Sequence, residues 1–222
     1  TYSCDPLAWG GRSFPGCHYG ASGLTNMYTG FSLSENAIAL RVARDIGLPK
    51  VIATAQKMGI KSKLNDVPAL ILGQSEVNML EITGSYGAVA NGGVWQKPRV
   101  IKRVYDTSNC DLKQIRKCRV MYDYTKDAPS QRVLKASTAA TLTTMMRGVV
   151  TNGSGKNAAI GMGEVGKTGT TNDNVDIWFI GFIPDKKVVT GVWLGNDNNS
   201  PAKVSSAQAA QLWGNYMGSV FK

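Results

Sequence analysis

The chain has 222 residues, and its 25 lysines and arginines against 15 aspartates and glutamates give a formal net charge of +10. Because 43% of the residues are hydrophobic, the chain can bury a substantial core, which excludes wholesale disorder. No stretch approaches the roughly 18 consecutive apolar residues of a membrane-spanning helix. The first residues also lack the basic and apolar regions of a signal peptide.

The first third of the chain is predicted to be a loop followed by helices. Residues 1–33 are rich in Gly, Ser, Tyr and Pro and have no sustained periodicity, so we expect a loop there. A helix is then predicted over residues 34–47, with Ser34 as its N-cap and Gly47 at its end. Further helical segments are expected over residues 48–59 and 78–93.

The rest of the chain alternates predicted helices and strands. Residues 93–106 have the β-branched and aromatic composition of a strand, and residues 107–130 are polar, charged and typical of a surface hairpin or insertion. The later predictions are a helix over 131–150, a glycine loop over 151–158, strands over 163–171, 176–185 and 187–197 with a hairpin turn between the last two, and a closing helix over 205–221. This order predicts an α+β fold with an antiparallel β-sheet flanked by helices.

The basic residues are scattered, without a run of five or six like charges. The densest clusters are Lys97, Arg99, Lys102 and Arg103, followed by Lys113, Arg116, Lys117 and Arg119. Neither zinc-finger spacing nor an aromatic RNA-binding box accompanies this charge, so we expect no binding of nucleic acid. A basic surface that faces an anionic polymer or a membrane is the preferred interpretation.

The four cysteines form two pairs that are close in sequence, Cys4 with Cys17 and Cys110 with Cys118. Two local disulfides would suit an oxidising, extracytoplasmic compartment, and the alternative is four free thiols in a cytosolic protein. CxxC spacing is absent and His18 is the single histidine, so a zinc site would lack ligands. We therefore expect neither a metal nor a cofactor.

Residues 167–170 offer the strongest chemistry. A Ser-His-Asp triad is disfavoured because His18 lies in a loop, where we expect it to be structural or exposed. Serine chemistry without histidine needs a lysine whose pKa is lowered. On the predicted strand, alternation places Lys167 and Gly169 on one face and Thr168 and Thr170 on the other. Gly169 would let a substrate approach the backbone closely. The alternative is an ordinary Lys-Thr-Gly turn.

The triplet Lys-Thr-Gly is also a motif of the penicillin-recognising serine enzymes. Three segments resemble, in order, the transpeptidase domain of the penicillin-binding proteins, particularly that of the bifunctional class A enzymes: residues 33–60, 70–104 and 166–201. The resemblance implies a D-alanyl-D-alanine transpeptidase that cross-links peptidoglycan through a serine acyl-enzyme. It implies peptidoglycan stem peptides and β-lactams as ligands, with other cell-wall synthesis proteins as further partners.

The same resemblance implies roles for single residues. Ser34 would relay a proton towards the leaving amine, and Asn36 would bind the substrate amide. The middle residue of this Ser-x-Asn motif varies in the family, so Glu35 is no objection. Lys167 would supply positive potential. Thr168 and Thr170 would bind the C-terminal carboxylate, and the N–H of Thr170 would be an oxyanion-hole donor.

One departure concerns the nucleophile, which in this family lies in an SxxK motif before Ser-x-Asn. No lysine precedes Ser34. The chain's one SxxK sequence, Ser200 to Lys203, follows residues 167–170, and its proline disfavours a helical turn, so we expect a loop without a catalytic role. We therefore expect the nucleophile, a glycosyltransferase domain and a membrane anchor to lie upstream.

On this interpretation, residues 1–222 are the C-terminal portion of one transpeptidase domain, incomplete at the N-terminus. Its parts are a loop-rich segment (1–33), the Ser-x-Asn helical region (34–106), a surface insertion (107–130), and the sheet with its closing helix (131–222). The location would be extracytoplasmic, with membrane contact only through the anchor. The alternatives are a non-catalytic module that binds cell-wall peptides, and a hydrolytic relative such as a D-Ala-D-Ala carboxypeptidase or a β-lactamase.

Overall fold

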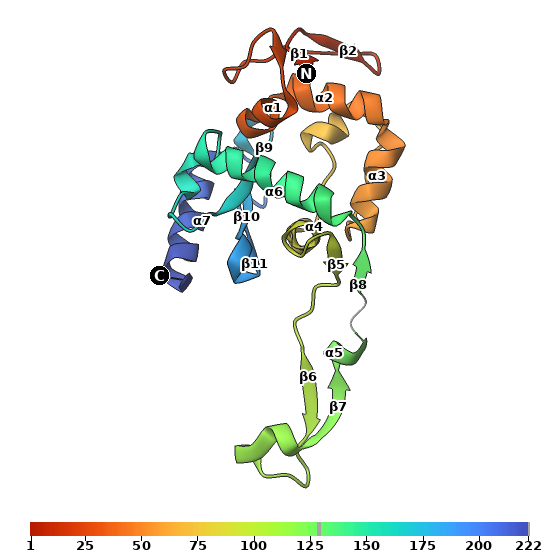
Figure 1. Ribbon diagram of the computed structural model, residues 1–222, viewed down its shortest axis with the longest axis vertical. Helices are drawn as coiled ribbons and strands as arrows, with labels where there is room; N and C mark the ends of the chain where they lie inside the picture. Colours follow the sequence, from red (N-terminus) through yellow and green to blue (C-terminus); the bar gives the residue numbers. More distant parts are fainter. Residues whose placement is uncertain (128–129, 222) are drawn as a thin grey trace.

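The computed structural model describes residues 1–127 and 130–221, and it consists of a three-stranded antiparallel sheet flanked by helices (Figure 1). Residues 128 and 129, which fall in the predicted insertion, and residue 222 lie outside the described residues. None of the helices described is both long enough and apolar enough to cross a membrane.

The central sheet has the strand order β11–β10–β9 and is antiparallel throughout. Its strands are β9 (Val165–Thr170), β10 (Asp176–Ile183) and β11 (Val188–Gly195). A 3-10 turn at Pro184–Lys186 joins the last two strands, so the three strands and the hairpin turn of the sequence prediction are confirmed. Because β9 pairs only with β10 among the described strands, it forms an edge of this sheet.

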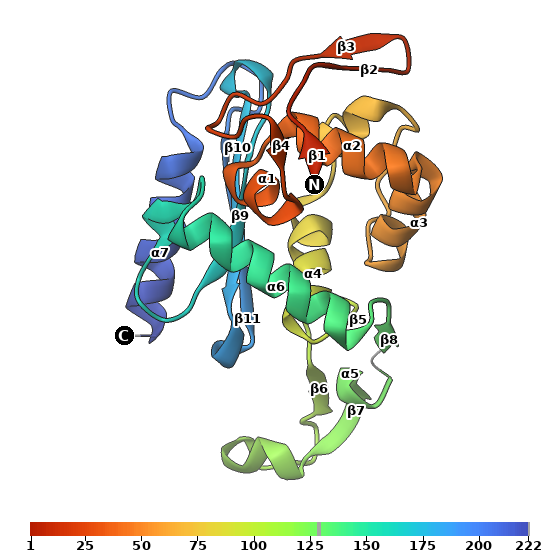
Figure 2. The ribbon, with the colours of Figure 1, turned by 45° about the horizontal axis from the view of Figure 1, so that its top comes forward.

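Helices cover both faces of the sheet, as Figure 2 shows for α7 and α4. Alternation along β10 divides its side chains: Phe179 packs with Trp213 and Met217 of α7 (Ser206–Phe221), all fully buried. On the opposite face, Phe182 packs in a cluster with residues of α4 (Met79–Ala90) and α6 (Ala136–Thr151). The central strand is therefore buried on both sides, which explains its almost continuous apolar sequence.

The first 33 residues correct the prediction of a loop. They contain the short strands β1 (Tyr2–Ser3), β2 (Leu7–Trp9), β3 (Arg12–Phe14) and β4 (Leu24–Thr25), and the helix α1 (Met27–Leu33). The strands are two or three residues long and pair only with one another, and α1 spans about two turns. Segments this short leave no hydrophobic periodicity to detect.

The helices after α1 agree with prediction except at one end. They are α2 (Asn36–Ile46) and α3 (Leu48–Lys57), followed by the 3-10 segment η1 (Pro68–Leu72). The prediction that Ser34 is the N-cap of a helix is wrong: Ser34 is the C-cap of α1, and Glu35 takes the N-cap position of α2. A serine can occupy either end of a helix, and α1 was too short to be recognised.

The strand predicted over residues 93–106 is interrupted. It is divided into β5 (Val94–Gln96) and β6 (Arg103–Asp106), which pair with β8 (Ser130–Arg132) and β7 (Arg119–Asp123) respectively. Pro98 lies in the break, where it has no N–H to donate and restricts the residue before it. Neither strand joins the central sheet.

The β6–β7 hairpin projects from the body of the molecule (Figure 1), and residues 107–123 of the predicted surface insertion lie within it. Its tip carries the 3-10 segment η2 (Leu112–Lys117) and the disulfide between Cys110 and Cys118, and α5 (Tyr124–Asp127) follows β7. The remaining 3-10 turns are η3 (Lys156–Ala158) in the predicted glycine loop and η4 (Asn172–Asn174) before β10.

Candidate active site

Two predicted residues that are 133 positions apart in sequence meet in the structure. The Nζ atom of Lys167, on the edge strand β9, donates a hydrogen bond of 2.7 Å to Oγ of Ser34. It donates a second bond of 3.1 Å to the backbone oxygen of Thr168 and lies 5.6 Å from the centre of the Phe31 ring. The turn between α1 and α2 and the edge of the sheet therefore converge on one lysine.

Enclosure of this lysine changes its acidity. Burial lowers the pKa of Lys167 to about 8, because an ammonium group loses hydration when it is buried. A lysine with this pKa gives up its proton far more readily than an exposed lysine does. The pair of Lys167 and Ser34 can therefore move a proton between nitrogen and oxygen near neutral pH.

Ser34 reaches the lysine from an unusual backbone conformation. Its φ of 63° and ψ of 38° lie in the left-handed region, which costs a residue other than glycine about 1–2 kcal/mol. Ser34 N–H donates to Phe31 and Glu35 N–H donates to Gly30, so the turn closes the end of α1. Strain of this kind at a polar residue is typical of functional sites.

A third segment, the loop after α6, connects the last turn of α1 with β9. The N–H of Ser154 donates a bond of 3.0 Å to the oxygen of Ser32, and its Oγ lies 2.6 Å from Oγ1 of Thr168. A Cβ added at Gly153 would lie 2.0 Å from the Ser32 oxygen, so only glycine fits at this approach. Ser154 was not among the residues predicted from the sequence, because a Gly-Ser-Gly triplet indicates a loop but not what the loop contacts.

The other predicted residues lie beside this junction. Asn36, half-buried, is the first residue of α2. Gly169 and Thr170 continue β9 and pair with Trp178 and Ile177 of β10. A Cβ at Gly169 would lie 3.1 Å from Cβ of Trp178, so a larger side chain would crowd the neighbouring strand. Thr168 is buried and Thr170 is exposed at the strand end.

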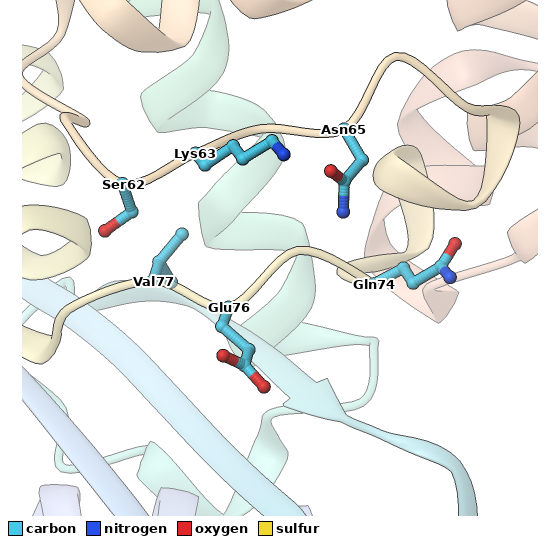
Figure 3. A pocket seen from close by; sticks show the side chains of 6 residues that line it. All are labelled: Ser62, Lys63, Asn65, Gln74, Glu76 and Val77. Atoms are coloured by element: carbon cyan, nitrogen blue, oxygen red, sulfur yellow. The ribbon is translucent and has the colours of Figure 1, made fainter.

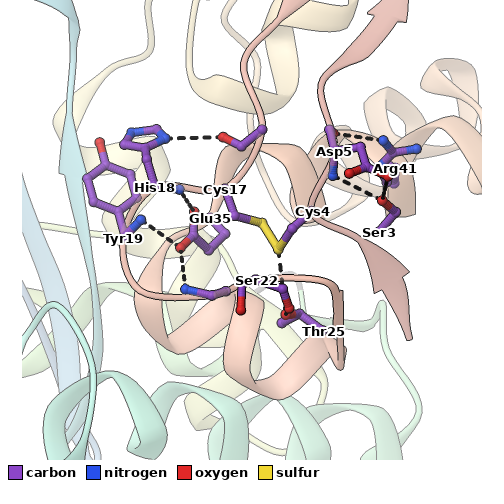
Figure 4. The surroundings of a disulfide bond; sticks show 12 residues. Ser3, Cys4, Asp5, Cys17, His18, Tyr19, Ser22, Thr25, Glu35 and Arg41 are labelled. Carbon is purple, nitrogen blue, oxygen red and sulfur yellow. Dashed lines mark hydrogen bonds between the residues drawn. A yellow bond between two sulfur atoms is a disulfide. The ribbon is translucent and has the colours of Figure 1, made fainter.

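Glu35 has a structural environment that the sequence analysis did not anticipate. Its side chain is only 1% exposed, and its carboxylate accepts hydrogen bonds from the backbone N–H groups of His18, Tyr19 and Ala21 at 3.0, 2.8 and 3.2 Å. Figure 4 shows these bonds beside the disulfide between Cys4 and Cys17. Both predicted disulfides are therefore present in the structure.

His18 and the SxxK sequence take the places expected for them. His18 is exposed, and its Nδ1 lies 3.2 Å from the oxygen of Gly16. Ser200 to Lys203 form a loop after β11, and they line a hollow of about 560 Å³ next to Trp193.

A larger hollow of about 590 Å³ lies between the two loops that flank η1 (Figure 3). Polar side chains line most of it: Ser62, Lys63, Asn65, Gln74 and Glu76, together with Val77. Neither hollow is lined by Ser34 or Lys167. The candidate site therefore rests on the hydrogen-bonded junction of three segments and not on a cavity.

Comparison with known proteins identifies the family of this chain. The sequence profile of the penicillin binding protein transpeptidase domain matches residues 1–218. Penicillin-binding protein 1A of Rickettsia bellii is 32% identical over 204 residues, which cover 86% of this chain and 25% of that protein. Penicillin-binding protein 1B of Escherichia coli is 31% identical over 196 residues, which cover 86% of this chain and 22% of that protein. The chain thus spans about a quarter of the length of these relatives.

Solved structures show the same fold. The structure of PonA1 from Mycobacterium tuberculosis in complex with penicillin V superimposes with a TM-score of 0.83 and 18% identity, covering 100% of this chain and 63% of that one. The imipenem acyl-enzyme complex of penicillin-binding protein A from the same organism superimposes with a TM-score of 0.79 and 19% identity. This match covers 100% of this chain and 55% of that one. The predicted α+β fold is therefore confirmed. With a sequence profile that matches nearly its whole length, this chain belongs to the penicillin-binding protein transpeptidase domain family.

Proposed function

We propose that the protein is a D-alanyl-D-alanine transpeptidase that cross-links peptidoglycan through a serine acyl-enzyme and is acylated by penicillins. The observation that carries the proposal is the 2.7 Å hydrogen bond from Lys167 Nζ to Ser34 Oγ at the edge of β9. It joins the Ser-x-Asn and Lys-Thr-Gly segments, which are far apart in sequence, into one polar site next to an open strand edge.

In this proposal, Ser34 and Lys167 handle a proton. A nucleophilic serine of an SxxK motif, outside residues 1–222, gives its hydroxyl proton to the lysine of that motif and attacks the peptide carbonyl of the terminal D-Ala-D-Ala. Because Lys167 donates to Ser34 Oγ, the Ser34 hydroxyl can direct its own hydrogen towards the amine of the departing D-alanine. The amine takes that proton and Lys167 replaces it, so the acyl-enzyme forms as the leaving group becomes neutral.

The remaining residues would hold the substrate. Thr168 and Thr170 bind the C-terminal carboxylate, with Lys167 providing positive charge, and Asn36 binds the amide of the peptide. The substrate backbone pairs with the open edge of β9, where the N–H of Thr170 donates to the developing oxyanion. The bond between Ser154 and Thr168 supports this arrangement, because it restricts the hydroxyl of a residue that must be oriented.

The larger protein is also part of the proposal. Residues 1–222 form the C-terminal portion of one transpeptidase domain, and the parent protein carries the SxxK segment, a glycosyltransferase domain and a membrane anchor. Two disulfides and a net charge of +10 support an extracytoplasmic site beside anionic cell-wall polymer and lipid.

The test is to label the full-length gene product with a fluorescent penicillin and to sequence the acylated peptide. We expect label on a serine of an SxxK motif, and we expect Lys167→Ala to reduce labelling strongly while Ser200→Ala leaves it unchanged. A correctly folded full-length protein that takes up no penicillin, or that is labelled at Ser200, would contradict the proposal. Analysis of the products formed from a stem peptide then separates transfer to an amine from hydrolysis.

A further inference from the structure

The two backbone hydrogen bonds that close α1 support the conformation of Ser34 from within its turn, and contacts from outside the turn restrain it further. A serine in the left-handed region relaxes to a more ordinary conformation unless its surroundings hold it there. Because only Cβ separates Oγ from the backbone, rotation of that backbone would carry Oγ away from the Nζ of Lys167. The residues that restrain the turn therefore set the geometry of the Ser34–Lys167 hydrogen bond.

Glu35, directly after Ser34, provides one restraint. Among the residues that the structure describes, Glu35 makes no ion pair, because the only one joins Arg103 to Asp123. Backbone N–H groups therefore compensate the charge of the Glu35 carboxylate. Oε1 accepts from Tyr19 and Ala21, and Oε2 accepts from His18. A buried carboxylate with three such bonds fixes the side chain in one position. The Ser34–Glu35 turn is thereby attached to the segment 18–21.

The disulfide between Cys4 and Cys17 fixes that segment in turn. Cys17 immediately precedes His18. The N–H of Cys17 donates a hydrogen bond of 2.9 Å to the oxygen of Cys4, and the N–H of Cys4 donates one of 2.8 Å to the oxygen of Gly23. The segment between Cys17 and Gly23 is therefore closed at both ends on Cys4. The N–H groups of His18, Tyr19 and Ala21, which bond to Glu35, lie within this closed segment.

The same frame reaches Ser34 from the other side. Strand β1, which precedes Cys4, pairs with β4, and Asn26 then caps the start of α1. Helix α1 runs from that cap to Ser34 at its C-terminus. The disulfide is thus connected to Ser34 through α1 and also through Glu35, so the turn is held from both ends.

We propose that Glu35 and the Cys4–Cys17 disulfide form one positioning unit, which keeps Ser34 in its left-handed conformation and so places Oγ on Lys167. Glu35 is a positioning residue, because its carboxylate bonds to the segment 18–21 and not to Ser34 Oγ or Lys167 Nζ. This inference rests on the proposed function. It predicts that the chemical step of acylation depends on a disulfide and a carboxylate that take no part in it.

The experiment uses the full-length protein and a fluorescent penicillin, with the non-covalent dissociation constant and the acylation rate constant measured separately. The variants are Glu35→Gln and the double variant Cys4→Ser/Cys17→Ser. Gln keeps one acceptor oxygen but turns an amide N–H₂ towards His18. The matched controls are Glu81→Gln, which also loses a carboxylate that accepts backbone N–H groups, and Cys110→Ser/Cys118→Ser.

We expect each test variant to lower the acylation rate constant about 10- to 100-fold, as small displacements of a catalytic group do, and the dissociation constant to change little. Both controls should acylate at the wild-type rate. Combining Glu35→Gln with the cysteine variant should add almost nothing to either alone, because both break the same unit.

Three results would overturn this inference while leaving the proposed function standing: wild-type acylation by either test variant, additive effects in the combination, or a loss confined to the dissociation constant. If the cysteine variant does not fold, the native disulfide is reduced instead in the Cys110→Ser/Cys118→Ser background. The rate must then fall on reduction and return on reoxidation, and a rate that stays constant counts against the unit. Failure of the wild-type protein to acylate would refute the proposed function itself.

Discussion

At the scale of single residues, the site depends on a lysine that is costly to bury. Lys167 is held by Ser34 Oγ and the Thr168 oxygen, and its pKa is lowered by loss of hydration from an ordinary 10.5 to about 8. A resemblance to a family can identify this residue from the sequence. The magnitude of the effect depends on enclosure by α1, which is visible only in the folded chain.

The first prediction concerns stability against pH. Below pH 8 Lys167 is protonated in both the folded and the unfolded chain, and burial of its charge opposes folding. Between about pH 8 and 10.5 only the unfolded chain binds the proton, so the free energy of unfolding rises with pH. Lys167→Met should be more stable than wild type at pH 7 by about 2–4 kcal/mol, a difference that shrinks towards pH 10.5. Urea unfolding of both proteins across this range measures it. A difference independent of pH would contradict the lowered pKa.

The second prediction concerns Ser154. Ser154→Ala removes the hydroxyl 2.6 Å from the buried Oγ1 of Thr168 and leaves that group without its partner. We expect the free energy of unfolding to fall by about 1–2 kcal/mol. Ser219→Ala, which loses a bond to Tyr216 at the exposed end of α7, serves as the control and should change stability by less than about 0.5 kcal/mol. A loss of stability in Ser154→Ala that is as small as the loss in the control would show that the Thr168 hydroxyl finds another partner.

At the scale of secondary structure, long periodic segments were predictable and short ones were not. The strand β10 and the helix α7 follow from continuous apolar sequence and helical spacing, because the burial that selects their residues also stabilises them. The strands β1 to β4 are too short to carry a period. Pro98 was visible in the sequence and could have predicted the break between β5 and β6.

The third prediction tests the packing of α7. Trp213 is fully buried against Phe179, with ring centres 5.3 Å apart, and its Nε1 donates to the oxygen of Thr190. Trp213→Ala should lower the free energy of unfolding by about 3–5 kcal/mol, because it leaves a large cavity and an unpaired carbonyl. Tyr216→Ala on the exposed side of α7 should cost less than about 1 kcal/mol. Comparable losses in the two variants would refute this packing.

The fourth prediction concerns the β6–β7 hairpin. Its strands pair with each other, and the N–H of Tyr124 donates to Lys102 at its base, so the chain ends lie close together there. Replacing residues 103–123 by a short turn should leave the stability of the remainder within about 1 kcal/mol, because no core cluster among the described residues includes the hairpin. Thermal unfolding of the shortened protein measures this. A large loss would show that the hairpin supports the core.

At the scale of the whole molecule, the sequence by itself determined the fold class, the apolar core strand and the closing helix, because each follows from local pattern. The short separations along the chain favoured the two disulfides over free thiols. The residue pattern singled out residues 167–170, and resemblance to a family added Ser34 and Asn36 as candidates. Only the tertiary structure decided that Ser34 ends α1 in a left-handed conformation, that Lys167 donates to it, and that Glu35 and Ser154 support the site. These contacts join residues up to 133 positions apart, and such contacts exist only after the sheet and helices have packed.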